Sequence, residues 1–138
     1  MSPLTHDAMG DYRKLEVWKL ACAISDRVEA VCAHLPRRAQ ASLGDQLMRA
    51  SESIHLNIAE GCGLNSDRQL LKHVRIALGS ANELDDGLER LDRRGLLRPE
   101  HRDLLTDAPI LRRRLGAFLK KLTQSDAEPP APDNRGER

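Results

Sequence analysis

Apolar side chains recur along this chain at alternating spacings of four and three residues, a pattern typical of helices that bury one face. The pattern predicts helices over residues 12–35, 40–60 and 67–94, and a fourth that begins near Pro99. Their buried seams are Val17, Ala21, Ile24, Val28, Val31, Leu35; Leu43, Leu47, Ala50, Ile54, Asn57, Gly61; Leu70, Val74, Ala77, Ala81, Leu84, Leu88, Leu91; and Leu104, Ala108, Leu111, Leu115, Phe118, Leu122.

Residues that favour the start or the end of a helix lie at the ends of these seams. Proline ends the helix before it, and glycine just past a helix favours a left-handed cap. A polar residue before the first turn caps the helix N-terminus, and Pro inside a helix removes a hydrogen bond. These rules predict starts at Asp11, Ser66 with Gln69, and Pro99, stops at Pro36, Gly61-Cys62-Gly63 and Gly95, and a kink or restart at Thr106 to Ala108 caused by Pro109.

The domain organisation follows from these segments and from length. At 138 residues the chain is sized for a single domain with its own core. We expect a flexible lead-in at residues 1–10, the helices at 11–124, and a disordered tail at 125–138 that is rich in Pro and charge. Because short loops make neighbouring helices antiparallel, the predicted fold is an all-α, up-down four-helix bundle.

Composition narrows the class of protein. The chain has one Trp, one Tyr and one Phe, so its core must be aliphatic, and a net charge of +1 argues against a surface that binds polyanions all over. Neither a secretory signal pattern nor an apolar run of about 20 residues occurs, so no membrane association is expected. Cys22, Cys32 and Cys62 include no Cys-x-x-Cys pair and are predicted to be reduced, buried thiols of a cytoplasmic protein.

The sequence contains no complete catalytic motif. Glu52-x-x-His55 has the spacing of a di-iron ligand pair, but such sites need two copies and further carboxylates. There is no nucleophile elbow, and the glycines at 61 and 63 lack the Lys-Ser/Thr of a phosphate loop. We therefore predict a protein that is not an enzyme, with no catalytic residue, cofactor or metal.

Basic residues gather in the fourth predicted helix. Residues 110–124 contain no acid and five cations, Arg112, Arg113, Arg114, Lys120 and Lys121. One interpretation is a solvated face whose charges complement the helix C-terminus. The other is a strip that contacts nucleic-acid phosphates, with weak sequence specificity because no aromatic side chains accompany it.

A second set of polar residues lies on the predicted second and third helices. Asn57 interrupts an apolar seam, so its amide needs a hydrogen-bond partner across the core. Asn57 with Glu60, and Ser80 with Glu83, are each three residues apart and share a helix face. Their distances from the intervening loop predict that Asn57 and Ser80 lie at different levels. We interpret Asn57 as fixing helix register and Glu60 as fixing the connection, near a subunit boundary.

Small residues in the middle of the third helix, Gly79 to Ala81, are predicted to let a neighbouring helix approach closely.

The motifs resemble those of a known family, the four-helix bundle proteins of 23S rRNA intervening sequences. The similarity extends over about residues 12–122, with departures at Leu35 and Leu64, where relatives often carry Phe and Arg. It rests on Leu15-x-Val17-Trp18-x-x-Ala21, Leu35-Pro36, Gln46-Leu47-x-Arg49-Ala50-x-x-Ser53-Ile54-x-x-Asn57-Ile58-Ala59-Glu60-Gly61, Ser66, and Ile76-Ala77-x-Gly79-Ser80-Ala81-x-Glu83-Leu84.

The resemblance implies a bacterial bundle that assembles as a homopentameric ring and has no established enzymatic activity. The family is similar to the accessory variability determinant proteins of diversity-generating retroelements, which bind a reverse transcriptase and its template RNA. The leading hypothesis is thus an oligomeric scaffold or accessory protein that contacts RNA or DNA. The alternative is a pure protein-protein interaction module, for example for a reverse transcriptase, with no nucleic-acid contact of its own.

Overall fold

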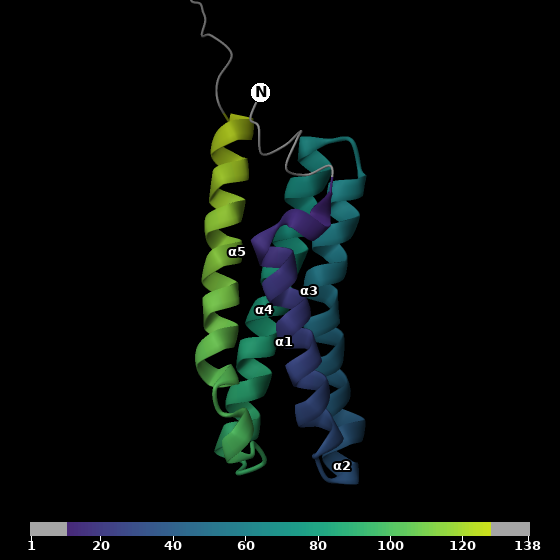
Figure 1. The fold of residues 1–138 in the computed structure, drawn as a ribbon, viewed down its shortest axis with the longest axis vertical. Helices are drawn as coiled ribbons and strands as arrows, with labels where there is room; N and C mark the ends of the chain where they lie inside the picture. The colour runs from purple at the N-terminus through teal and green to yellow at the C-terminus, as the bar shows by residue number, and fades with distance from the viewer. Residues whose placement is uncertain (1–10, 128–138) are drawn as a thin grey trace, which may run out of the picture.

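The computed structural model describes residues 11–127, with side chains to residue 124. Four long helical rods run alternately down and up (Figure 1), which confirms the predicted all-α, antiparallel bundle. The predicted lead-in lies outside the described residues, as does most of the predicted tail. Residues 125–127 belong to the last helix, so the predicted end of the bundle at residue 124 is three residues too early.

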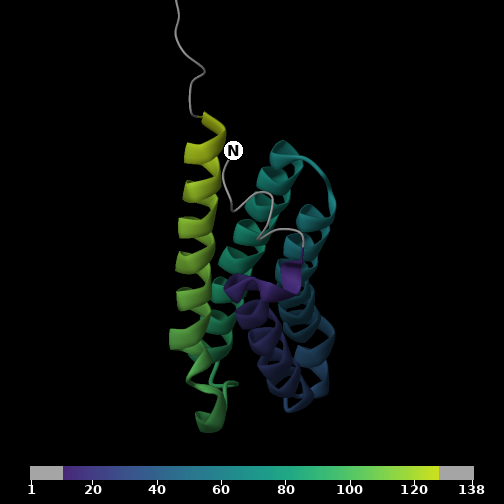
Figure 2. The same ribbon diagram turned by 45° about the horizontal axis from the view of Figure 1, so that its top comes forward.

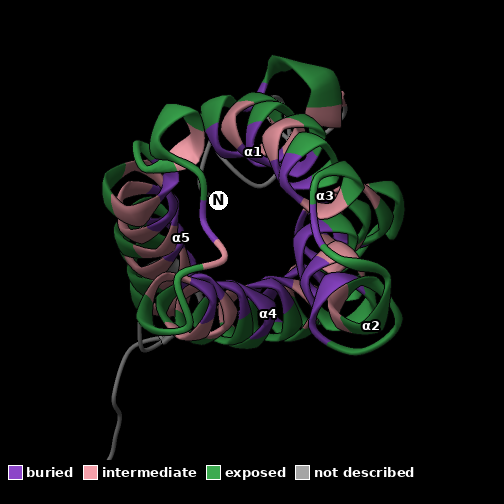
Figure 3. Cartoon of the chain, turned by 90° about the horizontal axis from the view of Figure 1, so that it is seen from below, coloured by how far each residue is buried: buried purple, intermediate pink, exposed green. Residues whose placement is uncertain are grey.

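The core lies along the axis of the bundle. Viewed end-on, α1, α3, α4 and α5 form a ring in that order, with buried residues inside and exposed residues outside (Figure 3). Every predicted seam residue is buried except Asn57. Since the seams are almost entirely Leu, Ile, Val and Ala, burial of aliphatic area is the main force that holds the rods together.

The first rod is shorter than its apolar pattern predicted. A 3-10 turn, η2 (Tyr12–Lys14), is capped by Asp11, whose side chain accepts a hydrogen bond from Arg13 N. Leu15 then adopts an extended conformation, and α1 (Glu16–Ala33) follows. The single helix predicted over residues 12–35 is therefore wrong at both ends. Its C-terminal limit has a local cause, because the residue before Pro36 is disfavoured in the helical region.

The second rod starts directly after Pro36 and has three parts. They are α2 (Arg37–Ala39), a π-helical stretch η3 (Gln40–Gly44), and α3 (Asp45–Gly63). The predicted glycine cap is wrong, because Gly61 and Gly63 lie inside α3 and its C-cap is Leu64 in an extended conformation. Gly95 is the described glycine with positive φ.

Glycine at position 61 serves close packing instead of a turn. A Cβ atom there would be 2.9 Å from His73 Cβ on the next rod. At Gly87 a Cβ would be 2.6 Å from Leu47 Cδ2. The predicted role of Gly79 in close approach is wrong, because nothing lies within 4 Å of a Cβ built there. The close contacts between α3 and α4 therefore depend on Gly61 and Gly87.

The third rod, α4 (Asp67–Arg93), confirms its predicted start and stop. Ser66 Oγ accepts a hydrogen bond from Gln69 N at 3.3 Å, so Ser66 is the N-cap. After the helix, Gly95 has φ 70° and Leu96 N donates to Leu91 O at 2.9 Å. This wrap-around hydrogen bond is the reason that a glycine is required here, because the left-handed region penalises other residues.

The fourth rod begins with a 3-10 turn, η4 (Pro99–His101), followed by α5 (Leu104–Ala127). The restart between these elements lies before the position predicted from Pro109, which sits inside α5 without ending it. Figures 1 and 2 show α5 along one side of the bundle, with the turn between α3 and α4 at the same end as its C-terminus.

Candidate functional site

Four cations form an exposed face on α5, here called the cationic face: Arg113, Arg114, Lys120 and Lys121. Arg113 and Lys120, like Arg114 and Lys121, are seven residues apart, which is about 10.5 Å along a helix. No acid from residue 110 to 124 lies among them. Among the described residues, none of the four makes an ion pair within 4.0 Å, so these charges face solvent.

Arg112, the fifth cation of the predicted strip, has a different position. Its Nε lies 2.6 Å from Asp85 Oδ2 on α4, and the side chains of Arg112 and Asp85 are only 36% and 19% exposed. Arg112 therefore holds α5 against α4 and does not belong to the cationic face. The sequence carried a signal for this, because Arg112 directly follows the seam residue Leu111 and Asp85 directly follows the seam residue Leu84.

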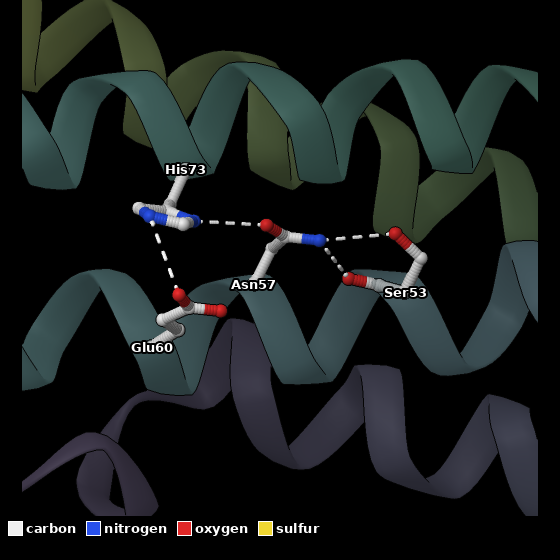
Figure 4. A network of polar contacts seen from close by, with 4 residues as sticks. All are labelled: Ser53, Asn57, Glu60 and His73. Atoms are coloured by element: carbon white, nitrogen blue, oxygen red, sulfur yellow. Dashed lines mark hydrogen bonds and ion pairs between the residues drawn. The ribbon is translucent and has the colours of Figure 1, made fainter.

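Asn57 has the hydrogen-bond partners that its position demanded. Its Nδ2 donates to Ser53 O at 2.8 Å and to Ser53 Oγ at 3.0 Å, while its Oδ1 lies 2.9 Å from His73 Nδ1 on α4 (Figure 4). Because the Asn57 amide nitrogen already donates to Ser53, Oδ1 accepts and the His73 proton sits on Nδ1.

This contact corrects the prediction that Asn57 lies on the buried seam of its helix. Asn57 is half-buried at the edge of the α3–α4 interface, and Ile58 occupies the core beside it.

The contacts continue to both sides of Asn57. Ser80 Oγ donates to Ser53 Oγ at 2.8 Å, and His73 Nε2 lies 3.9 Å from Glu60 Oε2. Asn57 and Ser80 thus share Ser53 as a partner, so they lie closer together than their distances from the intervening loop predicted. We name Ser53, Asn57, Glu60, His73 and Ser80 the α3–α4 polar network. Ser53 and His73 were not predicted as members, although Ser53 precedes Asn57 by one helical turn.

Glu83 does not join this network. It is exposed and lines a cleft of about 550 Å³ between α3 and α4. Gln46, Arg49, Ser53, Ser80, Asp86 and Arg90 line the same cleft around an apolar floor that includes Leu47 and Gly87. The predicted pair Ser80 and Glu83 therefore faces one cleft, but only Ser80 is tied to α3 by a hydrogen bond.

The thiols are poorly suited to nucleophilic chemistry. Burial raises the pKa of Cys32 and of Cys62 to about 11, and it also raises the pKa of Cys22. Cys32 Sγ donates to Gly44 O at 3.4 Å. Within residues 11–124 no group of three or more His, Cys, Asp or Glu side chains is arranged to hold a metal ion. None of the described helices is both long enough and apolar enough to span a bilayer.

The fold and these features define a small antiparallel helical bundle with an exposed cationic helix and a polar network between two of its rods. The family model of the 23S rRNA-intervening sequence protein matches residues 13–117. The chain belongs to this family, as its sequence motifs predicted. A search of curated proteins gives no match.

Proposed function

We propose that this protein is an oligomeric scaffold or accessory protein without enzymatic activity, and that its cationic face contacts the phosphate backbone of RNA or DNA. The observation that carries the proposal is the set of exposed cations on α5, which make no ion pair with the described residues: Arg113, Arg114, Lys120 and Lys121. Lys and Arg side chains that contact phosphates release the counterions bound to the nucleic acid, and this release favours binding. Such contacts require positive charges that are accessible to solvent. Arg112 is excluded because Asp85 already binds it.

The surroundings of the cationic face favour backbone contact over base recognition. Phe118 is buried in the core, and Tyr12 and Trp18 pack edge to face with ring centroids 5.1 Å apart. α5 itself therefore presents no exposed aromatic ring beside the cations as a platform for base stacking. Binding through this face should depend strongly on salt and weakly on sequence.

Self-assembly would multiply the effect of this small face. The family resemblance points to a homopentameric ring, in which five copies of the face would act together on one nucleic-acid chain. Linked weak contacts bind much more tightly than one contact alone, so a net charge of +1 per chain is compatible with the proposal. Size-exclusion chromatography with light scattering measures the number of copies directly, and a monomer would contradict this part of the proposal.

A gel-shift titration tests the nucleic-acid contact. Duplex DNA and RNA are titrated at about 50 and 200 mM salt. We expect binding that weakens with salt and is lost in the double variant Arg113→Glu and Lys120→Glu. The matched control, Lys72→Glu and Arg75→Glu, changes the same charge at exposed positions of α4 and should bind more strongly than the face variant. No binding at low salt, or equal losses in both variants, contradicts the proposal.

A second candidate function is protein-protein recognition through the α3–α4 side of the bundle. Large apolar side chains of these two helices and of the residue that ends α3 are exposed: Leu56 at 57%, Leu64 at 40% and Ile76 at 42%. Their exposure favours a protein surface as partner, either a further copy of this chain or a reverse transcriptase of the retroelement type. Leu56→Ser with Ile76→Ser would then reduce assembly or partner binding and leave nucleic-acid affinity per chain unchanged. The opposite pattern would favour the first candidate.

A further inference from the structure

Two histidines that are far apart in sequence meet at one end of the bundle. His34 follows α1, and His101 is the last residue of η4. His101 Nε2 lies 3.4 Å from His34 Nδ1, and the two ring centroids are 5.5 Å apart with their planes at 32°. This end, at the bottom of Figure 1, is where α1 finishes and the chain passes from α4 to α5. The contact therefore joins the end of α1 to the connection between α4 and α5.

Hydrogen bonds hold the backbone of both histidines in place. His34 N donates to Val31 O at 3.1 Å, and His101 N donates to Arg98 O at 2.9 Å. Buried leucines anchor the chain beside each ring, Leu35 after His34 and Leu104 after His101. His34 is nonetheless exposed and His101 is half-buried, so a small ion has access from solvent. The pair thus stands on a backbone that is held in place, and it is open to ligands.

The separation of the nitrogens is that of a long hydrogen bond, and it also matches the spacing of two nitrogens bound to one metal ion. Hydrogen bonds from ring nitrogens usually measure about 2.7–3.2 Å, shorter than the 3.4 Å found here. Two nitrogens bound to a tetrahedral zinc at about 2.0–2.1 Å lie about 3.3–3.4 Å apart. Imidazole is a preferred ligand of zinc, copper and nickel.

Two electrostatic features near the pair favour a bound cation, whereas Arg37 and Arg38, three and four residues after His34, oppose it. His34 caps the C-terminal end of α1, where the last carbonyl groups carry partial negative charge. The nearest cation in the chain to His101, Arg102, is bound to Asp92 with Nη1 2.5 Å from Oδ1. The positive charge of Arg102 is therefore largely offset by Asp92.

We propose that His34 and His101 form a two-imidazole site for a divalent transition-metal ion such as Zn²⁺, with water in the remaining coordination positions. The site lies outside the cationic face and the α3–α4 polar network, so it goes beyond the proposed function. The bound ion would tie the end of α1 to the α4–α5 connection and stabilise that end of the bundle. Because binding needs neutral imidazoles, the site should fill at neutral pH and empty in acid.

Zinc titration of the full chain, without an affinity tag and after removal of metal, tests the site. Calorimetry should show one Zn²⁺ per chain, and thermal unfolding should shift to higher temperature by mass action. Mg²⁺, which prefers oxygen ligands, should produce no shift. His34→Gln and His101→Gln should each weaken Zn²⁺ binding by about tenfold or more. His55→Gln, a histidine on α3 outside the pair, is the matched control and should bind as the wild type does.

Two further measurements separate metal binding from folding. The unfolding midpoint of each variant without metal shows that the bundle is intact. Long-range ¹⁵N–¹H spectra of the wild type should show Zn²⁺-induced shifts at the ring nitrogens of His34 and His101. Absence of Zn²⁺ binding overturns the proposal, as does equal binding in the two Gln variants and the wild type. So does binding that leaves the resonances of both rings unchanged.

Discussion

Gly61 on α3 and His73 on α4 approach so closely that a Cβ atom at position 61 would lie 2.9 Å from His73 Cβ. It would also lie 3.1 Å from Leu70 Cδ1. Gly61 is buried inside a regular helix and needs no positive φ. The hydrogen atom that replaces a side chain at this position is therefore what brings His73 within reach of Asn57 and Glu60.

Replacing Gly61 by alanine should destabilise the bundle. The added methyl group has to push α4 away, and overpacking of this kind costs about 1–3 kcal/mol. Urea denaturation measures the change. Gly79→Ala is the control, because nothing lies within 4 Å of its new Cβ and alanine in a helix interior gains about 0.5–1 kcal/mol over glycine. Equal effects of the two substitutions would contradict the packing role of Gly61.

Asn57→Leu should also reduce stability, because it leaves His73 Nδ1–H without its partner in a half-buried place. A buried polar group without a partner costs about 1–3 kcal/mol. A double-mutant cycle with His73→Ala should give a coupling energy of about 0.5–3 kcal/mol. Asn82, exposed on α4, provides the control. If Asn57→Leu also kept the oligomer of the wild type, Asn57 would have no role in assembly.

Arg112 and Arg113 should differ sharply although they are neighbours. Arg112→Gln removes the partner of a mostly buried carboxylate, Asp85, and should cost about 1–3 kcal/mol in urea denaturation. Arg113→Gln changes a solvated side chain and should stay within about 0.5 kcal/mol of the wild type. In the gel-shift titration the order should reverse, with the larger loss of affinity for Arg113→Gln. If the same variant showed the larger loss in both measurements, Arg112 and Arg113 would not have separate roles.

Alkaline pH should destabilise the protein through its thiols. In the unfolded chain a cysteine has a pKa near 9.0, whereas burial raises the pKa of Cys32 and Cys62 to about 11. The folded state holds these protons more tightly, so the stabilisation is complete below pH 9 and is lost as the pH rises through 11. Urea midpoints between pH 8 and pH 11 should fall less steeply for Cys32→Ser with Cys62→Ser. If the urea midpoints of the variant and the wild type fell with the same slope, groups other than Cys32 and Cys62 would cause the pH dependence.

The apolar periodicity was sufficient to predict the architecture. Spacings of four and three mark a helix face whatever packs against it, and the predicted seams of α4 and α5 are buried at every position. Caps that are local in sequence, such as Ser66 and Gly95, were predictable for the same reason.

Features that depend on a neighbouring rod were not predictable from local rules. Gly61 carries the signature of a helix cap, yet it lies inside α3, because contact with His73 decides its role. Arg112 carries the signature of an exposed cation, yet Asp85 holds it against α4. Nothing in the local sequence marks His73 as a hydrogen-bond partner of Asn57, because the contact forms only where α3 and α4 lie side by side. The members of the candidate sites were therefore only partly predictable, since their partners lie on other helices.

The π-helical stretch at Gln40–Gly44 has a consequence for how the second rod tolerates change. A π turn holds an additional residue, which rotates everything before it by about 100° relative to the helix after it. None of the residues Arg37 to Ala39 is buried, whereas the buried seam starts at Leu43. Ala39 packs partly against the core, whereas Arg37 and Arg38 are exposed. Substitutions at Arg37 and Arg38 can therefore alter that end of the molecule without disturbing the pairing of α3 with α4.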